Sequence, residues 1–478
     1  MDYETVIGLE VHTQLLTKSK MFCGCSADYA SAPPNTHVCP ICLGMPGVLP
    51  VINEKAIGFT VMTALALNSD IPEYTKFDRK NYFYPDLMKG YQISQYDAPL
   101  GKGGWLTIGQ NCTSKRINIT RVHLEEDTAK LRHKGSHSLI DVNRAGVPLM
   151  EIVSEPEMSS AAEARDYLIK LRSILRYLGV STGNMEEGSF RCDANISIRP
   201  PNTRELLPKA EVKNMNSFRA VYLAMEYEAK RQRNVLEDGG ELVQETRGWI
   251  DETGVTVTQR TKEYANDYRY FPEPDLPPLV LDRAWIEEIR ARLPELPEAR
   301  RDRFVSEYGL SSYDAGILTG SRAMADYFED CVKLMDPGKA KTTCNWLLGD
   351  FSRLLNATNI EIEDARIGPR HLSEMLVMVD NGTISGPAAK AVLEEMFHSG
   401  RSAGQVVAEK GLSQISDADE IREVIKQVIA SNSAAVADYA SGKQQAITFI
   451  IGQVMKATRG RANAGVVRDI IREQLGGK

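Results

Sequence analysis

Hydrophobic and polar residues alternate in three widely separated segments of the chain. In residues 7–15, Glu10, His12 and Gln14 occupy alternate positions, and apolar Ile7, Leu9, Val11 and Leu15 occupy the opposite face. Successive side chains of a β-strand point to opposite faces, so the pattern predicts a strand with one apolar and one ionisable face. Segments 116–130 and 191–199 repeat the pattern, with polar positions at Arg121, His123, Glu125, Asp127, Arg191, Asp193, Asn195 and Ser197. Acids alternating with histidine on several strands predict a shared metal site.

The spacing of apolar residues also predicts how the chain is organised. Strand-like runs with Gly and Pro turns fill the first part, interrupted by helical spacing at 54–68, 161–178 and 217–238. Because these elements do not alternate as βαβ units, we expect an α+β fold, with an antiparallel-sheet domain over residues 1–293. Helical spacing then predicts a helical domain over 294–405, and three apolar stripes predict a small C-terminal helical tail over 406–478.

Composition narrows the class of protein. The chain has 478 residues, 42% of them hydrophobic and 25% charged, which is ordinary for a globular protein. The N-terminus is acidic where a signal peptide is positive, and the longest apolar run, near 446–455, is too short to span a bilayer. We therefore expect a cytoplasmic protein with no membrane partner.

The charge distribution bears on nucleic-acid binding. The net charge of -7 argues against bulk attraction to nucleic acid but leaves room for a local basic patch. A basic cluster occurs near the C-terminus at Lys456, Arg459, Arg461, Arg468 and Arg472. Such a cluster is commonly a solvated face, but Gly460 and Asn463 within it would let the backbone approach a phosphate chain.

Four of the cysteines form two close pairs, Cys23 with Cys25 and Cys39 with Cys42. This spacing, with a turn at Pro40 and Gly44, suits a tetrahedral zinc knuckle over residues 23–42. Four thiolates would close the coordination sphere, so the predicted zinc is structural. Redox chemistry or unrelated buried thiols remain the alternative.

The ionisable face suggests its own chemistry. Glu10, His12, Glu125 and Asp127 could hold a divalent ion: carboxylates suit Mg²⁺, whereas histidine would also suit Mn²⁺ or Zn²⁺. Glu151 is an acid within the apolar segment 147–153. A buried acid is rare unless it is paired or binds a metal, but an exposed position on an edge strand is also open.

The sequence contains neither a P-loop nor a Rossmann fingerprint. A bound nucleotide would therefore need a metal and scattered cations, for which Lys80, Lys89, Arg191 and Lys213 are candidates. The sequence also lacks a nucleophile elbow, a Ser-rich amidase loop and a glutaminase-like Cys. No obvious group to hydrolyse an amide or release ammonia is present.

Eight ordered motifs carry a resemblance to a known family. They are residues 7–15, the cysteines at 23, 25, 39 and 42, and residues 90–95, 124–130, 141–151, 185–195, 211–216 and 267–276. Together they resemble the family of B subunits of aspartyl/glutamyl-tRNA(Asn/Gln) amidotransferases. The match runs from the first strand to the last helix.

The resemblance implies an antiparallel-sheet cradle, a helical domain and a YqeY-like, tRNA-binding tail. It implies that ATP and Mg²⁺ are used to phosphorylate the side-chain carboxylate of Glu-tRNA(Gln) or Asp-tRNA(Asn), which ammonia then converts to the amide. The ammonia would come from an amidase-type A subunit, and a small C subunit would stabilise the pair. A non-catalytic tRNA-binding scaffold is the alternative, and the sequence leaves open which tRNA is physiological.

The resemblance also implies roles for single residues. Glu10, His12, Glu125 and Glu151 match the family's magnesium and active-site motifs. Glu126, Asp127 and Asp193 lie beside them with weaker support. Alternation directs Glu126 away from Glu125, so its expected catalytic role is to face the ammonia route and accept a proton from ammonium. Asp193 is included with Lys80, Lys89, Arg191 and Lys213 in the expected cofactor-binding set. The chain departs from the family pattern at Met88, Ile250 and Ala464.

Overall fold

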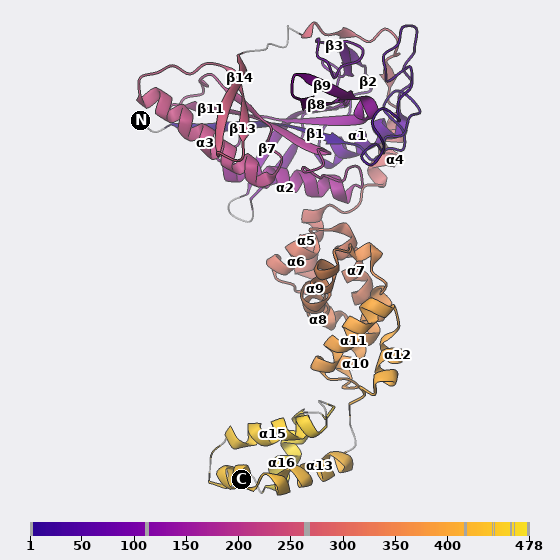
Figure 1. Ribbon diagram of the computed structural model, residues 1–478, viewed down its shortest axis with the longest axis vertical. Coiled ribbons are helices and arrows are strands. Elements are labelled where there is room, and N and C mark those ends of the chain that lie inside the picture. Colours follow the sequence, from indigo (N-terminus) through magenta and orange to yellow (C-terminus); the bar gives the residue numbers. More distant parts are fainter. Residues whose placement is uncertain are drawn as a thin grey trace. The chain divides into compact units, whose positions relative to one another are not determined.

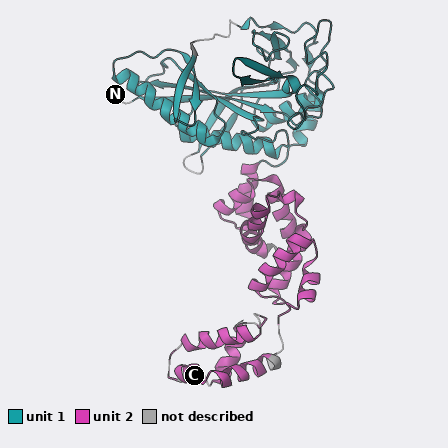
Figure 2. Ribbon diagram, in the orientation of Figure 1, with its two compact units in different colours: residues 1–296 teal, residues 297–478 magenta. Residues whose placement is uncertain are grey.

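We analysed a computed structural model, which describes residues 3–109, 114–261, 268–414, 418–441, 443, 445–458, 461–462 and 464–475. The chain divides into two compact units, residues 1–296 and 297–478 (Figure 2). Within the second unit, two separate hydrophobic clusters occupy the ranges 304–407 and 421–471. The domain bounds expected from the sequence stay a prediction.

A nine-stranded sheet forms the centre of the described part of unit 1 (Figure 1). Its strand order is β14-β13-β12-β11-β1-β10-β7-β5, with β6 also paired to β7. All pairs are antiparallel except β12 with β13. The strands are β1 (Glu4–Gln14), β5 (Gly101–Lys102), β6 (Trp105–Ile108), β7 (Lys115–Glu126), β10 (Pro148–Ser154), β11 (Phe190–Arg199), β12 (Ala210–Lys213), β13 (Glu245–Ile250) and β14 (Val255–Thr261).

Helices cover the apolar face of this sheet. They are α1 (Glu54–Ala66), α2 (Ala161–Tyr177) and α3 (Phe218–Glu237), while α4 (Arg283–Ala291) packs on α1. Figure 1 shows α2 and α3 lying along the sheet. Each of the first three helices begins after a side chain that caps a backbone N–H, supplied by Asn53, Ser160 and Ser217. Their apolar stripes bury Ile7, Leu9 and Val11 of β1, which leaves the ionisable face of the sheet open.

Smaller sheets border this open face. Strands β15 (Phe271–Pro272), β3 (Asp78–Asn81) and β4 (Tyr91–Ser94) form one, and β16 (Leu279–Val280) pairs with β2 (Tyr74–Thr75). A hairpin is formed by β8 (Lys130–Lys134) and β9 (His137–Asp141). The first of these sheets matters for function because it brings Lys80 and Ser94 to the cavity described below.

The second unit is helical. Its first cluster is built by α5 (Pro297–Tyr308), α6 (Ser312–Leu318), α7 (Arg322–Lys333), α8 (Ala340–Trp346), α9 (Ser352–Thr358), α10 (Pro369–Asp380), α11 (Gly386–Ser399) and α12 (Ala403–Lys410). Its second cluster is built by α13 (Ala418–Ser431), α14 (Ser433–Ala440), α15 (Gln445–Ala457) and α16 (Ala464–Gln474). The α+β fold class with its antiparallel-rich sheet and helical C-terminal part is confirmed. Among the described residues, no helix combines the length and apolarity needed to cross a bilayer.

Candidate active site

Strand register places the ionisable residues of three strands in one row. His12 of β1 lies opposite Glu151 of β10, and Glu151 lies opposite His123 of β7. Directly opposed residues share a face, so the three side chains point to the same side of the sheet. The strand carrying Glu151 is central and its side chain is buried, which excludes the edge-strand alternative.

A group of three possible metal ligands forms around this row. Ligand atoms of His12, Glu125 and Glu151 all lie within 4.8 Å of one another. The His12 Nε2 atom is 3.7 Å from Glu125 Oε1 and 3.5 Å from Glu151 Oε2. Ser94 donates a hydrogen bond of 3.1 Å to Glu125, which orients that carboxylate. Two carboxylates and one imidazole at this spacing fit a divalent cation that keeps further positions for water or substrate oxygen.

Electrostatics support a cation at this position. Burial disfavours the charged form of His12, but Glu151 and Glu125 outweigh it and raise the pKa of His12 to about 9. Burial likewise opposes ionisation of Glu151, yet His123 and His12 hold its pKa well below the ordinary value. The cluster therefore holds an ionised Glu151 against positive charge. A divalent ion would replace the proton on His12, since metal ligands must be deprotonated.

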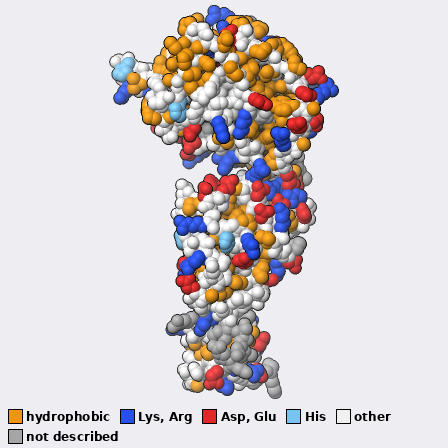
Figure 3. All heavy atoms as spheres, turned by 90° about the vertical axis from the view of Figure 1, so that its right-hand side faces the viewer, with side chains coloured by type: hydrophobic (Ala, Val, Ile, Leu, Met, Phe, Trp, Pro, Cys, Tyr) orange, Lys and Arg blue, Asp and Glu red, His pale blue; other side chains and the backbone are white. Residues whose placement is uncertain are grey.

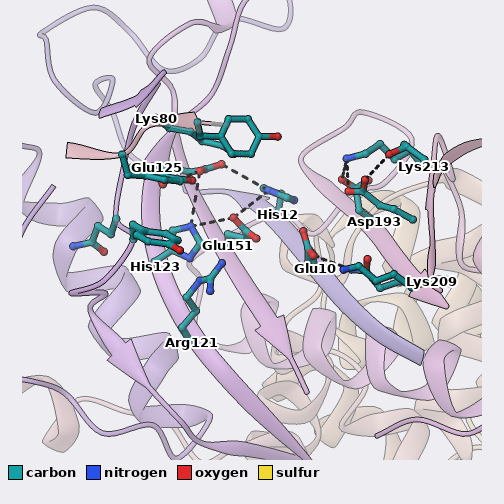
Figure 4. A pocket seen from close by; sticks show the side chains of 18 of the residues that line it. Glu10, His12, Lys80, Arg121, His123, Glu125, Glu151, Asp193, Lys209 and Lys213 are labelled. Carbon is teal, nitrogen blue, oxygen red and sulfur yellow. Dashed lines mark hydrogen bonds and ion pairs between the residues drawn. The ribbon is translucent and has the colours of Figure 1, made fainter. Parts of the chain in front are cut away.

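The group opens into a cavity of about 370 Å³ (Figure 4). Glu10 also lines it but lies outside the set of mutually close ligand atoms; Asn195 donates a hydrogen bond of 2.8 Å to its carboxylate. Burial, and then the charges of Glu151 and Glu211, raise the pKa of Glu10. Glu10 thus holds a proton more readily than an ordinary glutamate does, and its place in the magnesium ligand set stays a prediction.

Most of the cations expected to meet phosphate are neutralised by acids. Arg191 donates to Asp127 at 2.7 Å, and Lys213 pairs with Asp193 at 2.6 Å and with Glu211. Lys89 pairs with Glu126. Lys80 differs, because its Nζ lies 4.8 Å from the centre of the Tyr268 ring rather than beside a described carboxylate. Of the five expected cofactor-binding residues, Lys80, Asp193 and Lys213 line the cavity, whereas Arg191 lines an adjoining one.

Glu126 and Lys89 lie away from the cavity. Glu126 follows Glu125 on β7, so its side chain points to the opposite face of the strand. There it is buried and accepts a hydrogen bond of 3.0 Å from the backbone N–H of Ile93 as well as the Lys89 ion pair. The structure therefore separates the Lys89–Glu126 pair from His12, Glu125 and Glu151.

Several residues that line the cavity were not among the site residues expected from the sequence. His123 Nε2 lies 3.0 Å from Glu151 Oε2, and alternation along its strand had pointed to it. Arg121 shares that strand face, so the same signal applied. Lys209 and the stacked pair Tyr96 and Tyr270, with ring centres 4.3 Å apart, also line the cavity. Tyr270 belongs to the family motif at 267–276, but no role was assigned to it there. No sequence pattern pointed to Lys209 or Tyr96, which lie in loops.

The four paired cysteines come together as expected. The sulfur atoms of Cys23, Cys25, Cys39 and Cys42 all lie within 4.8 Å of one another. The sulfur atoms of Cys42 and Cys39 are 3.9 Å apart, and the Cys42 sulfur accepts a hydrogen bond from the Cys39 backbone N–H. Chiefly through its hydrogen bond with Cys23, the pKa of Cys42 is lowered to about 4. The neighbouring Cys42 and burial raise the pKa of Cys23 instead, and burial and the neighbouring thiols raise the pKa of Cys25, so of these three only Cys42 is favoured as a thiolate by the protein itself. Four sulfurs at this spacing fit zinc, whose charge would favour the other thiolates.

The C-terminal basic cluster is described only in part. Arg468 and Arg472 are exposed on α16, and Lys456 is exposed near the end of α15. Arg461 precedes α16 and is partly exposed. Arg459, Gly460 and Asn463 lie outside the described residues, as does Cys112. An RNA contact by this cluster stays a prediction.

Comparisons with known proteins now define the class. Residues 5–287 match the family described as GatB/GatE catalytic domain, and residues 326–475 match the family described as GatB domain. The chain is thus a protein of the GatB/GatE catalytic class.

Individual relatives narrow the assignment. The B subunit of the aspartyl/glutamyl-tRNA(Asn/Gln) amidotransferase of Dehalococcoides mccartyi is 56% identical over 99% of both chains. The proteins of that name from Carboxydothermus hydrogenoformans and Moorella thermoacetica are 54% and 55% identical, over 99% of this chain and 99% and 100% of theirs. The chain belongs to the family of aspartyl/glutamyl-tRNA(Asn/Gln) amidotransferase B subunits.

Proposed function

We propose that the chain is the B subunit of a glutamine-dependent tRNA amidotransferase, and that its cavity activates the side-chain carboxylate of Glu-tRNA(Gln) or Asp-tRNA(Asn). The names of its relatives support both tRNA substrates. The observation that carries the proposal is the His12, Glu125 and Glu151 group, which opens into a single cavity together with cationic and aromatic side chains. A carboxylate is a poor acyl donor, so an activation step is chemically necessary.

In this proposal the carboxylate oxygen of the aminoacyl group attacks the γ-phosphorus of ATP, ADP leaves, and an acyl phosphate forms. Ammonia then attacks the acyl carbon and phosphate leaves, giving the amide. His12, Glu125 and Glu151 would hold Mg²⁺, which supplies neutralisation of the phosphoryl charge. Glu10 lies within the same cavity and would act on protons there, because its raised pKa suits proton exchange.

The ammonia would come from glutamine hydrolysed on an amidase-type A subunit, with a small C subunit completing a heterotrimer. Exposed apolar side chains at Leu43, Met45, Leu49 and Val51 support a protein partner on unit 1. Figure 3 shows hydrophobic side chains across the face of unit 1 that it presents. Glu126, buried beside Lys89 away from the cavity, is retained as the acid that accepts a proton from ammonium.

The remaining assignments follow from the side chains present. Cys23, Cys25, Cys39 and Cys42 would hold a structural Zn²⁺, and the free thiols of the described chain suit a cytoplasmic location. The C-terminal helices with Arg468 and Arg472 would contact the tRNA backbone.

Reconstitution with the A and C subunits tests the function. We expect conversion of Glu-tRNA(Gln) to Gln-tRNA(Gln), or of Asp-tRNA(Asn) to Asn-tRNA(Asn), that requires ATP, Mg²⁺ and glutamine. Glu125→Gln and Glu151→Gln should each abolish measurable turnover while tRNA binding persists. Wild-type turnover by both variants would refute the site. A scaffold role would instead give tRNA binding without tRNA-stimulated ATP hydrolysis when free ammonia is supplied.

A further inference from the structure

Arg121 is a cavity residue that the proposed function leaves unused. It extends from β7 toward the cavity, on the same strand face as His123 and Glu125 (Figure 4). Its Nε atom is buried without a hydrogen-bond partner, and no carboxylate among the described residues pairs with its guanidinium. Buried polar groups in proteins are nearly always hydrogen-bonded, so this donor indicates a missing acceptor.

Three other cations near the site are paired with acids. Arg191, Lys213 and Lys89 are each neutralised by a carboxylate of this chain, although the Nε of Arg191 also lacks a hydrogen-bond partner. Cations already paired with acids have less to offer a bound anion than one whose donors are free. Arg121 is therefore better suited than these three to receive an anion from outside the chain.

Strand register places Arg121 beside the metal-ligand group. Arg121 lies opposite Val153 of β10, and Glu10 lies opposite Val153 on the other side. Two residues along β7, about 7 Å away, His123 lies opposite Glu151. An anion with one oxygen bound to a metal ion at Glu151 would thus have its other oxygens within reach of the Arg121 guanidinium.

The surroundings favour a nucleotide as the source of that anion. Tyr270, stacked on Tyr96, lines the same cavity, and Lys80 lies against the Tyr268 ring. Aromatic faces bind nucleobases by stacking. The planar guanidinium, with its fixed fork of donors, matches phosphate oxygens in a bidentate manner.

We propose that Arg121 binds the polyphosphate of ATP beside the metal site and stabilises the phosphoryl group during its transfer. The inference rests on the proposed function and deepens it by naming the residue that meets phosphate. Arg121 makes no contact with the metal in this assignment. A substitution of Arg121 should therefore weaken nucleotide binding and leave metal binding nearly unchanged.

The test uses the full chain and compares Arg121→Gln and Arg121→Lys with the control Arg116→Gln. Arg116 lies on the same strand but is exposed and stacks on Trp105. Two affinities are measured: that for a non-hydrolysable ATP analogue with Mg²⁺, by calorimetry, and that for Mn²⁺ alone, by electron paramagnetic resonance. We expect Arg121→Gln to weaken analogue binding by about tenfold or more and Arg121→Lys to restore part of it. Mn²⁺ binding should stay within about twofold, and Arg116→Gln should match wild type.

Other results would overturn the assignment. Unchanged analogue affinity in Arg121→Gln would exclude a phosphate contact. Unchanged analogue affinity with a raised KM for aminoacyl-tRNA in the reconstituted enzyme would assign Arg121 to the substrate carboxylate instead. Loss of Mn²⁺ binding together with analogue binding would make Arg121 a structural residue. Failure of the wild-type chain to bind the analogue at all would refute the proposed function itself, and with it this inference.

Discussion

Glu151 of β10 and His123 of β7 form a directly opposed cross-strand pair, with 3.0 Å between Glu151 Oε2 and His123 Nε2. Both side chains are buried. The pair fixes the direction in which Glu151 presents its carboxylate to His12 and Glu125. In metal sites, losing the hydrogen-bonding partner of a ligand typically costs about 10- to 100-fold in metal affinity.

Replacing His123 with Gln should therefore weaken the metal site. We expect Mn²⁺ affinity of the full chain to fall by about tenfold, because Glu151 loses a charge-assisted partner. Electron paramagnetic resonance measures free Mn²⁺ directly. His133→Gln, on the exposed β8 strand, is the matched control and should bind as wild type does. Equal affinity in both variants would show that His123 does not orient Glu151.

The cysteine cluster predicts one zinc per chain. Metal analysis of the purified protein should find it, and Cys42→Ser should lower the content strongly because one of four thiolates is lost. Cys344→Ala is the control: this thiol is buried in unit 2, far along the chain from the cluster. A zinc content in the wild type well below one per chain, with the metal retained throughout purification, would contradict the assignment.

The tail prediction concerns salt dependence. The double variant Arg468→Gln with Arg472→Gln removes two exposed charges from α16. We expect weaker tRNA binding and a slope of log affinity against log salt that is shallower by about 1 to 2. Filter binding across a salt series measures this. Arg370→Gln, an exposed charge on α10, should leave the slope unchanged. An unchanged slope in the double variant would remove these arginines from the tRNA contact, and truncation after about residue 405 would test the rest of the tail.

A pH effect is expected in the helical part of unit 2. Burial raises the pKa of Glu329 on α7, but Arg303 and Arg300 outweigh it, so the pKa falls below the ordinary value of 4.5. A carboxyl whose pKa is lowered by folding stabilises the native state above its unfolded pKa, and this stabilisation is lost as pH falls through the native value. The stability gained from Glu329 should thus be complete near neutral pH and decline below about pH 4.5.

Hydrogen exchange in α5 and α7 of the full chain tests this. Relative to wild type, Glu329→Gln should lower amide protection at pH 7, and the difference should shrink as the pH falls below about 4.5 once intrinsic exchange rates are corrected. Glu363→Gln changes an exposed acid and serves as control. A wild-type to Glu329→Gln difference that is constant with pH would show that the ion pairs with Arg300 and Arg303 do not act through ionisation.

Much of the fold was predictable from local pattern. The helices expected at 54–68, 161–178 and 217–238 occur as α1, α2 and α3, each shorter than expected by one or two residues in all. Within the helical domain expected over 294–405, a π-helical turn at Leu347–Phe351 separates α8 from α9. The spacing of apolar residues does not reveal a helical turn that holds one extra residue, so the sequence did not predict the π-helical turn.

The sequence by itself determined which residues face each side of the sheet. Period-two alternation put Glu10 and His12 on one face of β1 and Ile7, Leu9 and Val11 on the other, because side-chain direction is a local property of an extended backbone. Only the tertiary structure decided which faces meet. The antiparallel register sets Glu151 between His12 and His123, and a slip of one residue would have turned it to the opposite face.

The tertiary structure also decided which charged side chains neutralise each other. Lys89, Arg191 and Arg121 are equivalent as cations in the sequence. Folding places Glu126 beside Lys89 and Asp127 beside Arg191, and leaves the Arg121 guanidinium without a described carboxylate. Charge pairing depends on separations of a few ångströms between distant segments. Local pattern carries no information on those separations, so the cation best suited to bind phosphate could be recognised only in the folded chain.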